Sequence, residues 1–126
     1  MKSLYLAADG DDIGRKIEFF IVMNQMDSLS DFSHNYQSAM LWLVDILSKD
    51  FDAKIVFYGG DSLLASLTFK EYLIGDLEKL RVQFAILSHT TLSFGIGSNP
   101  RQAYFALKLA KASGKNKIEV FQEYSR

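Results

Sequence analysis

The stretch that decides the fold is residues 54–67, KIVFYGGDSLLASL. Residues 55–58 combine β-branched and aromatic side chains, which is typical of a strand, and residues 62–67 form a second apolar run. The pair Gly59-Gly60 separates the two runs. Two runs joined by a Gly-Gly pair predict a tight β-hairpin, because its turn needs positive φ at the centre. Asp61 then lies at the turn.

Further elements precede the hairpin. Residues 3–8 are apolar and predict a short buried strand, which ends at the acidic loop 9–12. Helical spacing of apolar residues predicts a helix from residue 13, a break near residues 27–28, and a second helix that ends near residues 49–50.

The remaining elements follow the hairpin. Thr68 and Glu71 have the spacing of a capping box, which predicts a helix over residues 69–85. The last three predicted elements are a strand over 91–97, a helix that Asn99-Pro100 begins and Gly114 ends, and a strand over 117–122.

The predicted order gives a fold class. The first part is βαββαβ, so we expect an α+β, ferredoxin-like fold with an added C-terminal helix and strand. A length of 126 residues fits a single domain over residues 1–126. With 48% hydrophobic residues, such a chain can bury a core of its own.

The composition excludes several functional classes. Lys plus Arg number 14 and Asp plus Glu 15, so a net charge of −1 argues against a basic nucleic-acid binder or a polybasic membrane-surface protein. The absence of Cys excludes disulfides, thiolate metal sites and a cysteine nucleophile, and it permits a cytoplasmic location. No apolar run approaches the ~20 residues of a transmembrane helix, and residues 4–8 are too short for a signal peptide.

Two carboxylates meet in the predicted topology. Asp9 ends the first strand and Asp61 lies at the hairpin turn, 52 positions later, and the sheet brings these two places together. Adjacent carboxylates repel one another unless a cation binds between them, and oxygen ligands favour Mg²⁺ or Mn²⁺ over Zn²⁺. Asp11, Asp12 or a backbone carbonyl near Gly10 can add ligands.

Glycines and lysines surround this position. Gly59 and Gly60 would let a nucleotide approach the turn closely, and backbone N–H groups near Gly14 can hold phosphate oxygens at a helix N-terminus. Tyr58 can either stack on a base or pack within the strand. The lysines at 108, 111 and 115 share one helix face, which is either a solvated face or a cationic arm that reaches a polyphosphate.

Plainer interpretations remain for each feature. A strand-ending Asp often only caps a helix, and a Gly-Gly-Asp sequence is often only a turn. Their convergence in one topology favours a functional site. His34 and His89 have no Cys or neighbouring His partner, so we expect them to be surface or capping residues.

Three of these segments resemble motifs of known families. DGDDIG (9–14) resembles the D-x-D-N-x-G element in the palm domain of the large type III CRISPR subunit. Residues 57–61 are similar to the G-G-D core of that palm and of GGDEF diguanylate cyclases. Residues 103–116, with AK at 110–111 and GKN at 114–116, are similar to the A-K-x-x-G-[RK]-N helix of both. Without an HD nuclease part or zinc ribbon, the chain most resembles the minimal CRISPR polymerases (mCpol), stand-alone palm domains associated with antiphage defence.

The resemblance implies a nucleotidyltransferase. A ribose hydroxyl would attack an α-phosphate, pyrophosphate would leave, and the product would be a cyclic dinucleotide or short cyclic oligonucleotide, with ATP as the expected substrate. Asp9 and Asp61 would be the catalytic, metal-binding carboxylates. The expected nucleotide-binding residues are Gly10, Asp11, Asp12, Gly14, Gly59, Gly60, Lys111 and Lys115. Ser62 departs from the family pattern, which has an acidic residue there, so this chain has one carboxylate fewer.

The expected partners follow from the geometry of this reaction and from the composition. Two triphosphates must face one another, and a palm this small presents one nucleotide pocket, so we expect a homodimer. We expect no membrane partner, and the net charge disfavours a nucleic-acid template. The alternative is a catalytically weak palm that binds nucleotide or cyclic nucleotide as a sensor.

Overall fold

The computed structural model describes residues 2–122, and within them the strands form a five-stranded sheet in the order β2-β3-β1-β4-β5. Neighbouring strands are antiparallel, except that β5 runs parallel to β4. This is the expected α+β, ferredoxin-like arrangement with an added strand. The strands are β1 (Ser3–Gly10), β2 (Lys54–Gly59), β3 (Ser62–Thr68), β4 (Leu92–Gly97) and β5 (Ile118–Val120).

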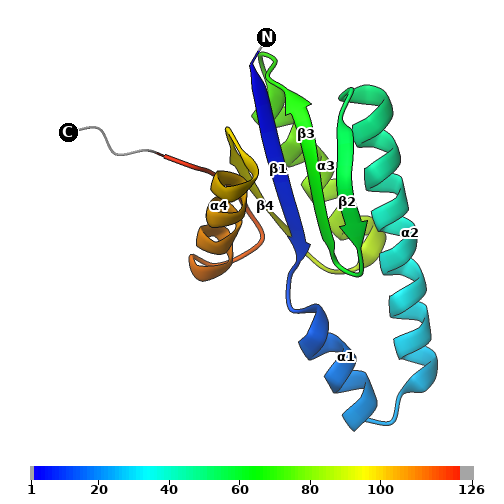
Figure 1. Ribbon diagram of the computed structural model, residues 1–126. Helices are drawn as coiled ribbons and strands as arrows, with labels where there is room; N and C mark the ends of the chain where they lie inside the picture. The colour runs from blue at the N-terminus through cyan, green and yellow to red at the C-terminus, as the bar shows by residue number, and fades with distance from the viewer. Residues whose placement is uncertain (1, 123–126) are drawn as a thin grey trace.

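Helices cover both faces of the sheet (Figure 1). Helices α2 and α3 lie on one face and α4 lies on the other. Helix α1 and the first half of α2 project beyond the end of β1 as a helical hairpin. The helices are α1 (Ile13–Val22), α2 (Met26–Asp50), α3 (Leu73–Ser88) and α4 (Pro100–Ala112).

The alternation of β1 decides which side chains face which helices. Leu4, Leu6 and Ala8 belong to the main core, which α2 and α3 complete. Ala7 packs instead with residues of α4 in a second, smaller cluster. Because side chains of a strand alternate between faces, Asp9 shares the face of Ala7 and lies on the side of α4.

A row of aromatic rings connects the projecting helices to the core. Phe20 of α1 contacts Phe32 of α2, with ring centroids 6.0 Å apart. Phe32 contacts Tyr36, and Tyr36 meets the fully buried Phe84 of α3 edge to face at 5.5 Å. Such pairs add about 0.5–1.5 kcal/mol each beyond area burial, so they fix the angle at which the projecting hairpin leaves the sheet.

The capping box predicted at Thr68 and Glu71 is wrong. Thr68 is the last residue of β3 and pairs with Ser3, and α3 begins only at Leu73. Tyr72 precedes the helix in a left-handed conformation, with φ of 68° and no side-chain cap. Thr68 is part of the pairing between β1 and β3, so it cannot serve as the N-cap of a helix.

Two other boundaries differ from the sequence prediction. The break between α1 and α2 lies at residues 23–25, where Asn24 has a φ of 56°, and not at 27–28. Asp27 stands in the first turn of α2, where its charge suits the helix dipole. Asparagine tolerates the left-handed region better than most residues, so Asn24 provides the bend.

The hairpin turn is shifted by one residue from the prediction. Gly59 pairs with Ser62, so the two central turn residues are Gly60 and Asp61. Of these two, only Gly60 has a positive φ, 58°, which is the pattern of a type II′ turn. The consequence is that Asp61 stands at the tip of the hairpin.

The start of α4 is confirmed. The Asn99 side chain accepts a hydrogen bond from the backbone N–H of Gln102 at 2.9 Å, and Pro100 occupies the first helical position. The N-cap satisfies one of the free N–H groups at the start of the helix. Residue 99 therefore fixes where α4 begins over the sheet.

Helix α4 lies directly on β4 because of Gly95. A Cβ atom built at Gly95 would collide with the backbone oxygen of Ala103 and the backbone nitrogen of Leu107. Both atoms belong to the helix backbone and cannot rotate away. This glycine therefore sets the distance between α4 and the sheet.

We predict that Gly95→Ala lowers the free energy of unfolding by about 1–3 kcal/mol or more, because α4 must move outward to admit the methyl group. Urea denaturation measures this change. The control is Gly75→Ala in α3, where a Cβ would meet nothing within 4 Å. There we expect a gain of about 0.5–1 kcal/mol from better helix propensity. Equal midpoints for the two variants would contradict the close approach at Gly95.

Candidate functional site

The sheet register brings Asp9 and Asp61 to one place. Asp9 pairs with Ser62 of β3 and with Ser93 of β4. The next residue, Gly10, donates its N–H to the backbone oxygen of Asp61 at 3.0 Å. The end of β1 and the tip of the hairpin are therefore adjacent, although 52 positions separate the two aspartates.

The Asp9 carboxyl has competing electrostatic influences. Burial raises the pKa of Asp9 above its ordinary value. The Lys111 ammonium, 3.3 Å from Oδ2, and the Ser62 hydroxyl, which donates to Oδ1 at 2.9 Å, act against this shift. The nearby charge of Asp61 adds to the raising of the pKa. The net rise means that the ionised Asp9 would be stabilised by further positive charge.

The Asp11 carboxylate is buried and accepts four hydrogen bonds. Its side chain is only 3% exposed, and its carboxylate accepts hydrogen bonds from Thr91 at 2.7 Å, Ser93 at 2.8 Å, Lys111 at 2.7 Å and the Asn116 N–H at 2.9 Å. Burial alone would raise the pKa of Asp11, but these hydrogen bonds outweigh burial and hold the pKa below its usual value. Asp11 is therefore an ionised group that joins β1 to β4 and to the segment after α4.

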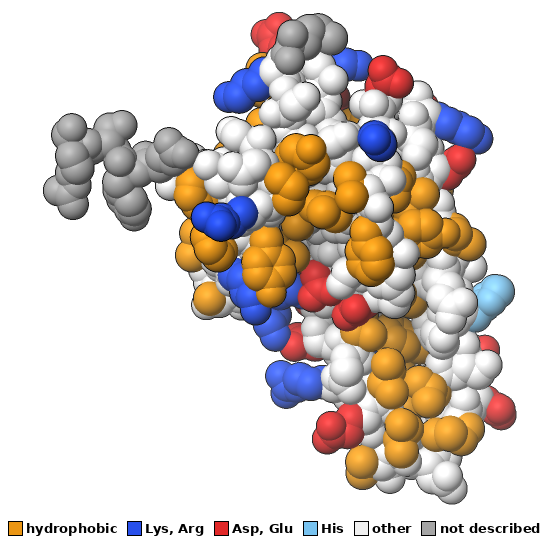
Figure 2. Space-filling view, in the orientation of Figure 1, with side chains coloured by type: hydrophobic (Ala, Val, Ile, Leu, Met, Phe, Trp, Pro, Cys, Tyr) orange, Lys and Arg blue, Asp and Glu red, His pale blue; other side chains and the backbone are white. Residues whose placement is uncertain are grey.

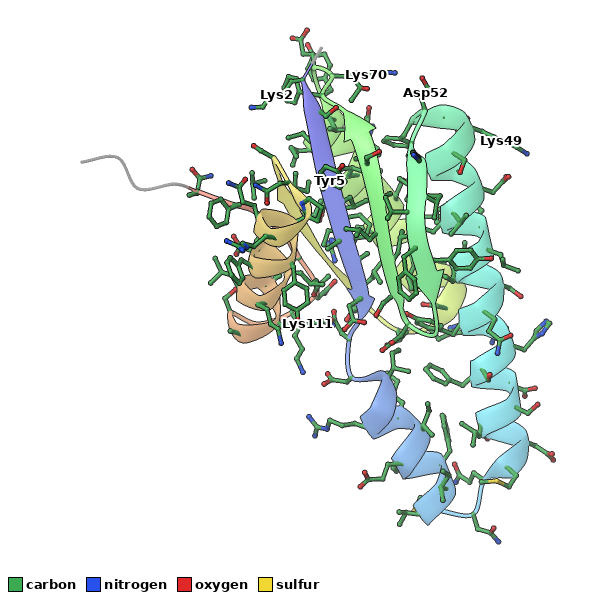
Figure 3. All side chains as sticks on the ribbon, viewed as in Figure 1. Lys2, Tyr5, Lys49, Asp52, Lys70 and Lys111 are labelled. Atoms are coloured by element: carbon green, nitrogen blue, oxygen red, sulfur yellow. The ribbon has the colours of Figure 1, made fainter. Side chains whose placement is uncertain are left out.

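The Lys111 ammonium lies among oxygen atoms at the end of β1 (Figure 3). It donates to the backbone oxygen of Gly10 at 2.8 Å, to that of Asp9 at 3.2 Å and to Oδ1 of Asp11 at 2.7 Å. The sequence analysis assigned Lys111 to a triphosphate. In the structure its contacts are with the acidic end of β1.

The other two lysines of α4 and its C-terminal segment differ from one another. Lys115 forms an ion pair and a short hydrogen bond with Asp12, and this hydrogen bond lowers the pKa of Asp12. Lys108 instead lies over the ring of Tyr104, 5.3 Å from its centroid. Figure 2 shows acidic and basic side chains next to each other where the sheet meets the projecting helices. Lys111 and Lys115 therefore face the acidic loop, whereas Lys108 packs on its own helix.

A broad groove of about 1170 Å³ adjoins this centre. Its walls are α1, α2 and the tip of the β2–β3 hairpin. Its lining includes five candidate nucleotide-site residues from the sequence analysis, namely Gly14, Tyr58, Gly59, Gly60 and Asp61. Polar side chains of α2 also line it, among them Ser33, His34 and Gln37. The groove therefore runs from a mixed apolar and polar wall to the acidic hairpin tip.

Tyr36 binds the backbone at the tip of the β2–β3 hairpin. Its hydroxyl donates to the backbone oxygen of Asp61 at 3.2 Å. Burial, and then the nearby carboxylates led by Asp61, raise the pKa of Tyr36, so the hydroxyl stays protonated as a donor. A Cβ at Gly10 would collide with the Tyr36 hydroxyl, so the small residue at position 10 is needed for this contact.

The sequence analysis gave no individual role to several residues that the structure places in the site. Thr91 and Ser93 are polar residues in an otherwise apolar strand, and this pattern was the signal that could have found them. Asn116, with a φ of 53°, receives a short hydrogen bond from the buried Arg81. Tyr36 resembles an ordinary core residue in the sequence. His89 is the C-cap of α3, as expected of a capping residue.

The donor set suits a hard divalent cation. The carboxylates of Asp9 and Asp61 and the carbonyl of Gly10 all supply oxygen. The Asp9 carboxylate and the Gly10 carbonyl already contact a cation, the Lys111 ammonium. Within residues 2–122, no three acidic or histidine side chains converge as a metal-binding group. Mg²⁺ is commonly bound through one or two carboxylates plus substrate phosphates, so the two aspartates fit such an ion.

One known protein family matches most of this chain. The sequence model of the minimal CRISPR polymerase domain, mCpol, matches residues 5–121. The chain belongs to the minimal CRISPR polymerase family. No curated protein sequence matches it.

Solved structures share the fold of this mCpol chain. An active GGEEF domain of a diguanylate cyclase from Vibrio cholerae is 16% identical, with a TM-score of 0.66 over 98% of this chain and 85% of the other. A GGDEF domain from Caulobacter crescentus, solved with c-di-GMP, is 17% identical, with a TM-score of 0.66 over 96% and 79%. A bacterial light-regulated adenylyl cyclase is 11% identical, with a TM-score of 0.60 over 91% and 73%. The mCpol chain therefore has a nucleotide-cyclase-like palm fold.

No helix within the described part of the mCpol chain, residues 2–122, has the length and apolar character to cross a membrane.

We predict that Asp11→Asn lowers the free energy of unfolding by about 3–5 kcal/mol, because it removes the charge that Lys111 and three other donors share in a buried site. The measurement is urea denaturation followed by the fluorescence of Trp42. Asp12→Asn is the matched control, since Asp12 is more exposed and its pairing with Lys115 is at the surface. Its midpoint should stay close to that of the unmodified protein. Similar midpoints for both variants would argue against a special role of Asp11.

Proposed function

We propose that this chain is a metal-dependent nucleotidyltransferase that converts a nucleoside triphosphate, with ATP as the preferred substrate, into a cyclic dinucleotide or short cyclic oligonucleotide. The product would act as a cytoplasmic signal in antiphage defence. The observation that carries the proposal is the register that brings Asp9 and Asp61 together beside a glycine-lined groove. Membership of the mCpol family and the cyclase-like fold support the class of reaction.

Asp9 and Asp61 would hold Mg²⁺ or Mn²⁺, with the carbonyl of Gly10 as a third oxygen. The bound ion would offset the negative charge of the phosphates and favour the ionised form of the attacking hydroxyl. Ser62 donates its hydroxyl to Asp9 and so orients that carboxylate. Because Ser62 brings no charge of its own, we expect phosphate oxygens of the substrate to complete the coordination.

The groove between α1, α2 and the hairpin would take the nucleoside. Gly59 and Gly60 keep side chains away from the hairpin wall, and Gly14 leaves the first turn of α1 open, with nothing within 4 Å of a built Cβ. A nucleoside in this groove would place its phosphates near Asp61 and the N-terminus of α1. Polar side chains of α2, such as Gln37, would face the base.

The positive charges near the centre would face the triphosphate. Lys115 is 36% exposed and is held near the loop by Asp12, so its ammonium can receive a phosphate without leaving its place. Asp11 would hold the end of β1 in the geometry that binding requires, and Lys111 would add a second positive charge for the triphosphate. These assignments extend the nucleotide-binding role expected for Asp11, Asp12, Lys111 and Lys115.

The reaction balances without a protein nucleophile. The oxygen of a ribose hydroxyl forms a bond to an α-phosphorus, the bond from that phosphorus to the bridging oxygen of the leaving pyrophosphate breaks, and the hydroxyl proton passes to solvent. A ring of two nucleotides needs two such steps and releases two pyrophosphates. Positioning and charge neutralisation provide most of the acceleration in phosphoryl transfer, which matches a site of carboxylates, lysines and backbone groups.

We predict that incubation with each NTP and Mg²⁺ or Mn²⁺ yields a cyclic product, identified by mass spectrometry. Asp61→Asn should lower the yield by at least about a hundredfold, as loss of a charge-stabilising group commonly does. It should keep the circular dichroism spectrum, because Asp61 stands at a turn. Asp45→Asn is the control, an exposed residue of α2 paired with Lys49. Turnover by Asp61→Asn at the normal rate would exclude the proposed metal site.

We also predict that a non-hydrolysable ATP analogue with Mg²⁺ promotes a homodimer. The acidic centre of one chain serves one triphosphate, so two centres must face one another for two nucleotides to join. Analytical ultracentrifugation with and without the analogue measures the change in mass. A monomer that still produces the cyclic product at high dilution would contradict this arrangement.

A second candidate function is a sensor that binds nucleotide or cyclic nucleotide without turnover. Ser62 favours this candidate, because it takes the position of an acidic residue in the related families. The two candidates differ in the NTP assay. Tight nucleotide binding with no product from any NTP would select the sensor.

A further inference from the structure

The Lys111 ammonium contacts the same oxygen atoms that a divalent cation would need. It reaches the backbone oxygens of Asp9 and Gly10 at 3.2 and 2.8 Å, and it lies 3.3 Å from the Asp9 carboxylate. Asp11 holds it from the other side at 2.7 Å. The end of β1 thus presents a set of oxygens that converges on one positive charge.

These contacts satisfy Lys111 almost completely. An ammonium has three protons to donate, and three acceptors stand within 3.2 Å of Nζ, two of them backbone oxygens. The side chain is only 22% exposed, so little of its charge is left to water. The position is therefore a defined binding place for a cation.

Two cations cannot use these oxygens together. An ion bound to the Asp9 carboxylate and the Gly10 carbonyl would lie within a few ångströms of Nζ, where like charges in a partly buried site repel strongly. The oxygen atoms around Lys111 differ in whether a divalent ion could use them. Asp9 and Gly10 belong to the proposed metal centre, whereas Asp11 is fully engaged with β4 and Asn116.

We propose that Lys111 is the resident counter-cation of this centre, and that a divalent ion binds only by displacing its ammonium from Asp9 and Gly10. Asp11 keeps its hydrogen bond to the ammonium while the lysine side chain rotates away from Asp9 and Gly10. The displaced ammonium then faces the mouth of the centre, where a triphosphate would supply the negative charge that it has lost. The part of this proposal that concerns the divalent ion rests on the proposed function.

The proposal makes Lys111 a positioning residue that also lowers metal affinity. The divalent ion must compete with a tethered charge, so the protein binds it weakly by itself. The nucleotide compensates for this competition by accepting the ammonium. Metal and nucleotide are thereby coupled through one side chain.

The first test is a Mn²⁺ titration of the full chain without nucleotide, with free Mn²⁺ followed by electron paramagnetic resonance. An opposite charge at this distance changes an ionic equilibrium by about ten- to a thousandfold, so Lys111→Met should bind Mn²⁺ at least about tenfold more tightly than the unmodified protein. Arg101→Met removes one charge from the exposed first turn of the same helix and should change nothing. Asp9→Asn should abolish the binding. Equal or weaker Mn²⁺ affinity of Lys111→Met, or no binding by either protein, would overturn the proposal.

A second test needs no variant that could fail to fold. The unmodified protein is treated briefly with acetic anhydride with and without Mg²⁺, and acetylation is quantified for each lysine by peptide mass spectrometry. Acetylation of Lys111 should rise several-fold with Mg²⁺, while that of Lys49, paired with Asp45 on α2, should stay constant. Unchanged or lower acetylation of Lys111 would overturn the proposal.

These outcomes are separate from those that test the function. Tighter Mn²⁺ binding by Lys111→Met without any turnover of NTPs would reject the nucleotidyltransferase and keep the counter-cation. Normal turnover of NTPs with an unchanged Mn²⁺ affinity of Lys111→Met would keep the nucleotidyltransferase and reject the counter-cation.

Discussion

The buried carboxylate of Asp11 is the interaction on which the rest of the structure depends. It joins four segments that are far apart in the sequence, namely β1, β4, the C-terminal part of α4 and the segment that leads to β5. A buried charge is tolerated only where every acceptor position is satisfied, and Asp11 meets that condition with donors from the protein itself. Asn116 extends the network to α3, since Arg81 donates to its side chain. The end of β1 is thereby held from both faces of the sheet.

The groove beside this rigid end has a different character. Helix α1 contributes no buried residue, and it leans on α2 through the contact between Phe20 and Phe32. Elements with few buried contacts open and adjust more easily than the core. The site therefore combines a fixed acidic end, set by the sheet, with a wall that can adapt to the shape of a bound molecule. This division suits chemistry that needs a fixed centre while the rest of the ligand enters from solvent.

The sequence was most informative where a feature repeats along a strand or a helix. The apolar runs at residues 3–8 and 62–67 and the glycines of the hairpin helped to predict the ferredoxin-like order, and this order predicted that the ends of β1 and the hairpin would meet. Local signals failed where a distant segment decides the outcome. Thr68 and Glu71 have the spacing of a capping box, but Thr68 pairs with Ser3 and therefore belongs to the sheet. The partners of Asp11 lie 80 to 105 positions away and could not be found from local pattern, although Thr91 and Ser93 are unusual in an apolar strand. The roles of Asp9, Asp61 and the lysines in catalysis remain predictions.

The close packing at Gly95 also bears on how quickly the centre can change. Because the backbone of α4 touches β4 at this residue, the helix cannot slide or tilt over the sheet to carry Lys111 away from Asp9. The ammonium would then leave by a rotation of the lysine side chain, which is a smaller and faster motion than a helix shift of microseconds or longer. Mg²⁺ gives up its water ligands reluctantly. If the centre binds Mg²⁺ as proposed, the rate of its uptake would then depend on the ion's own loss of water and not on a movement of α4.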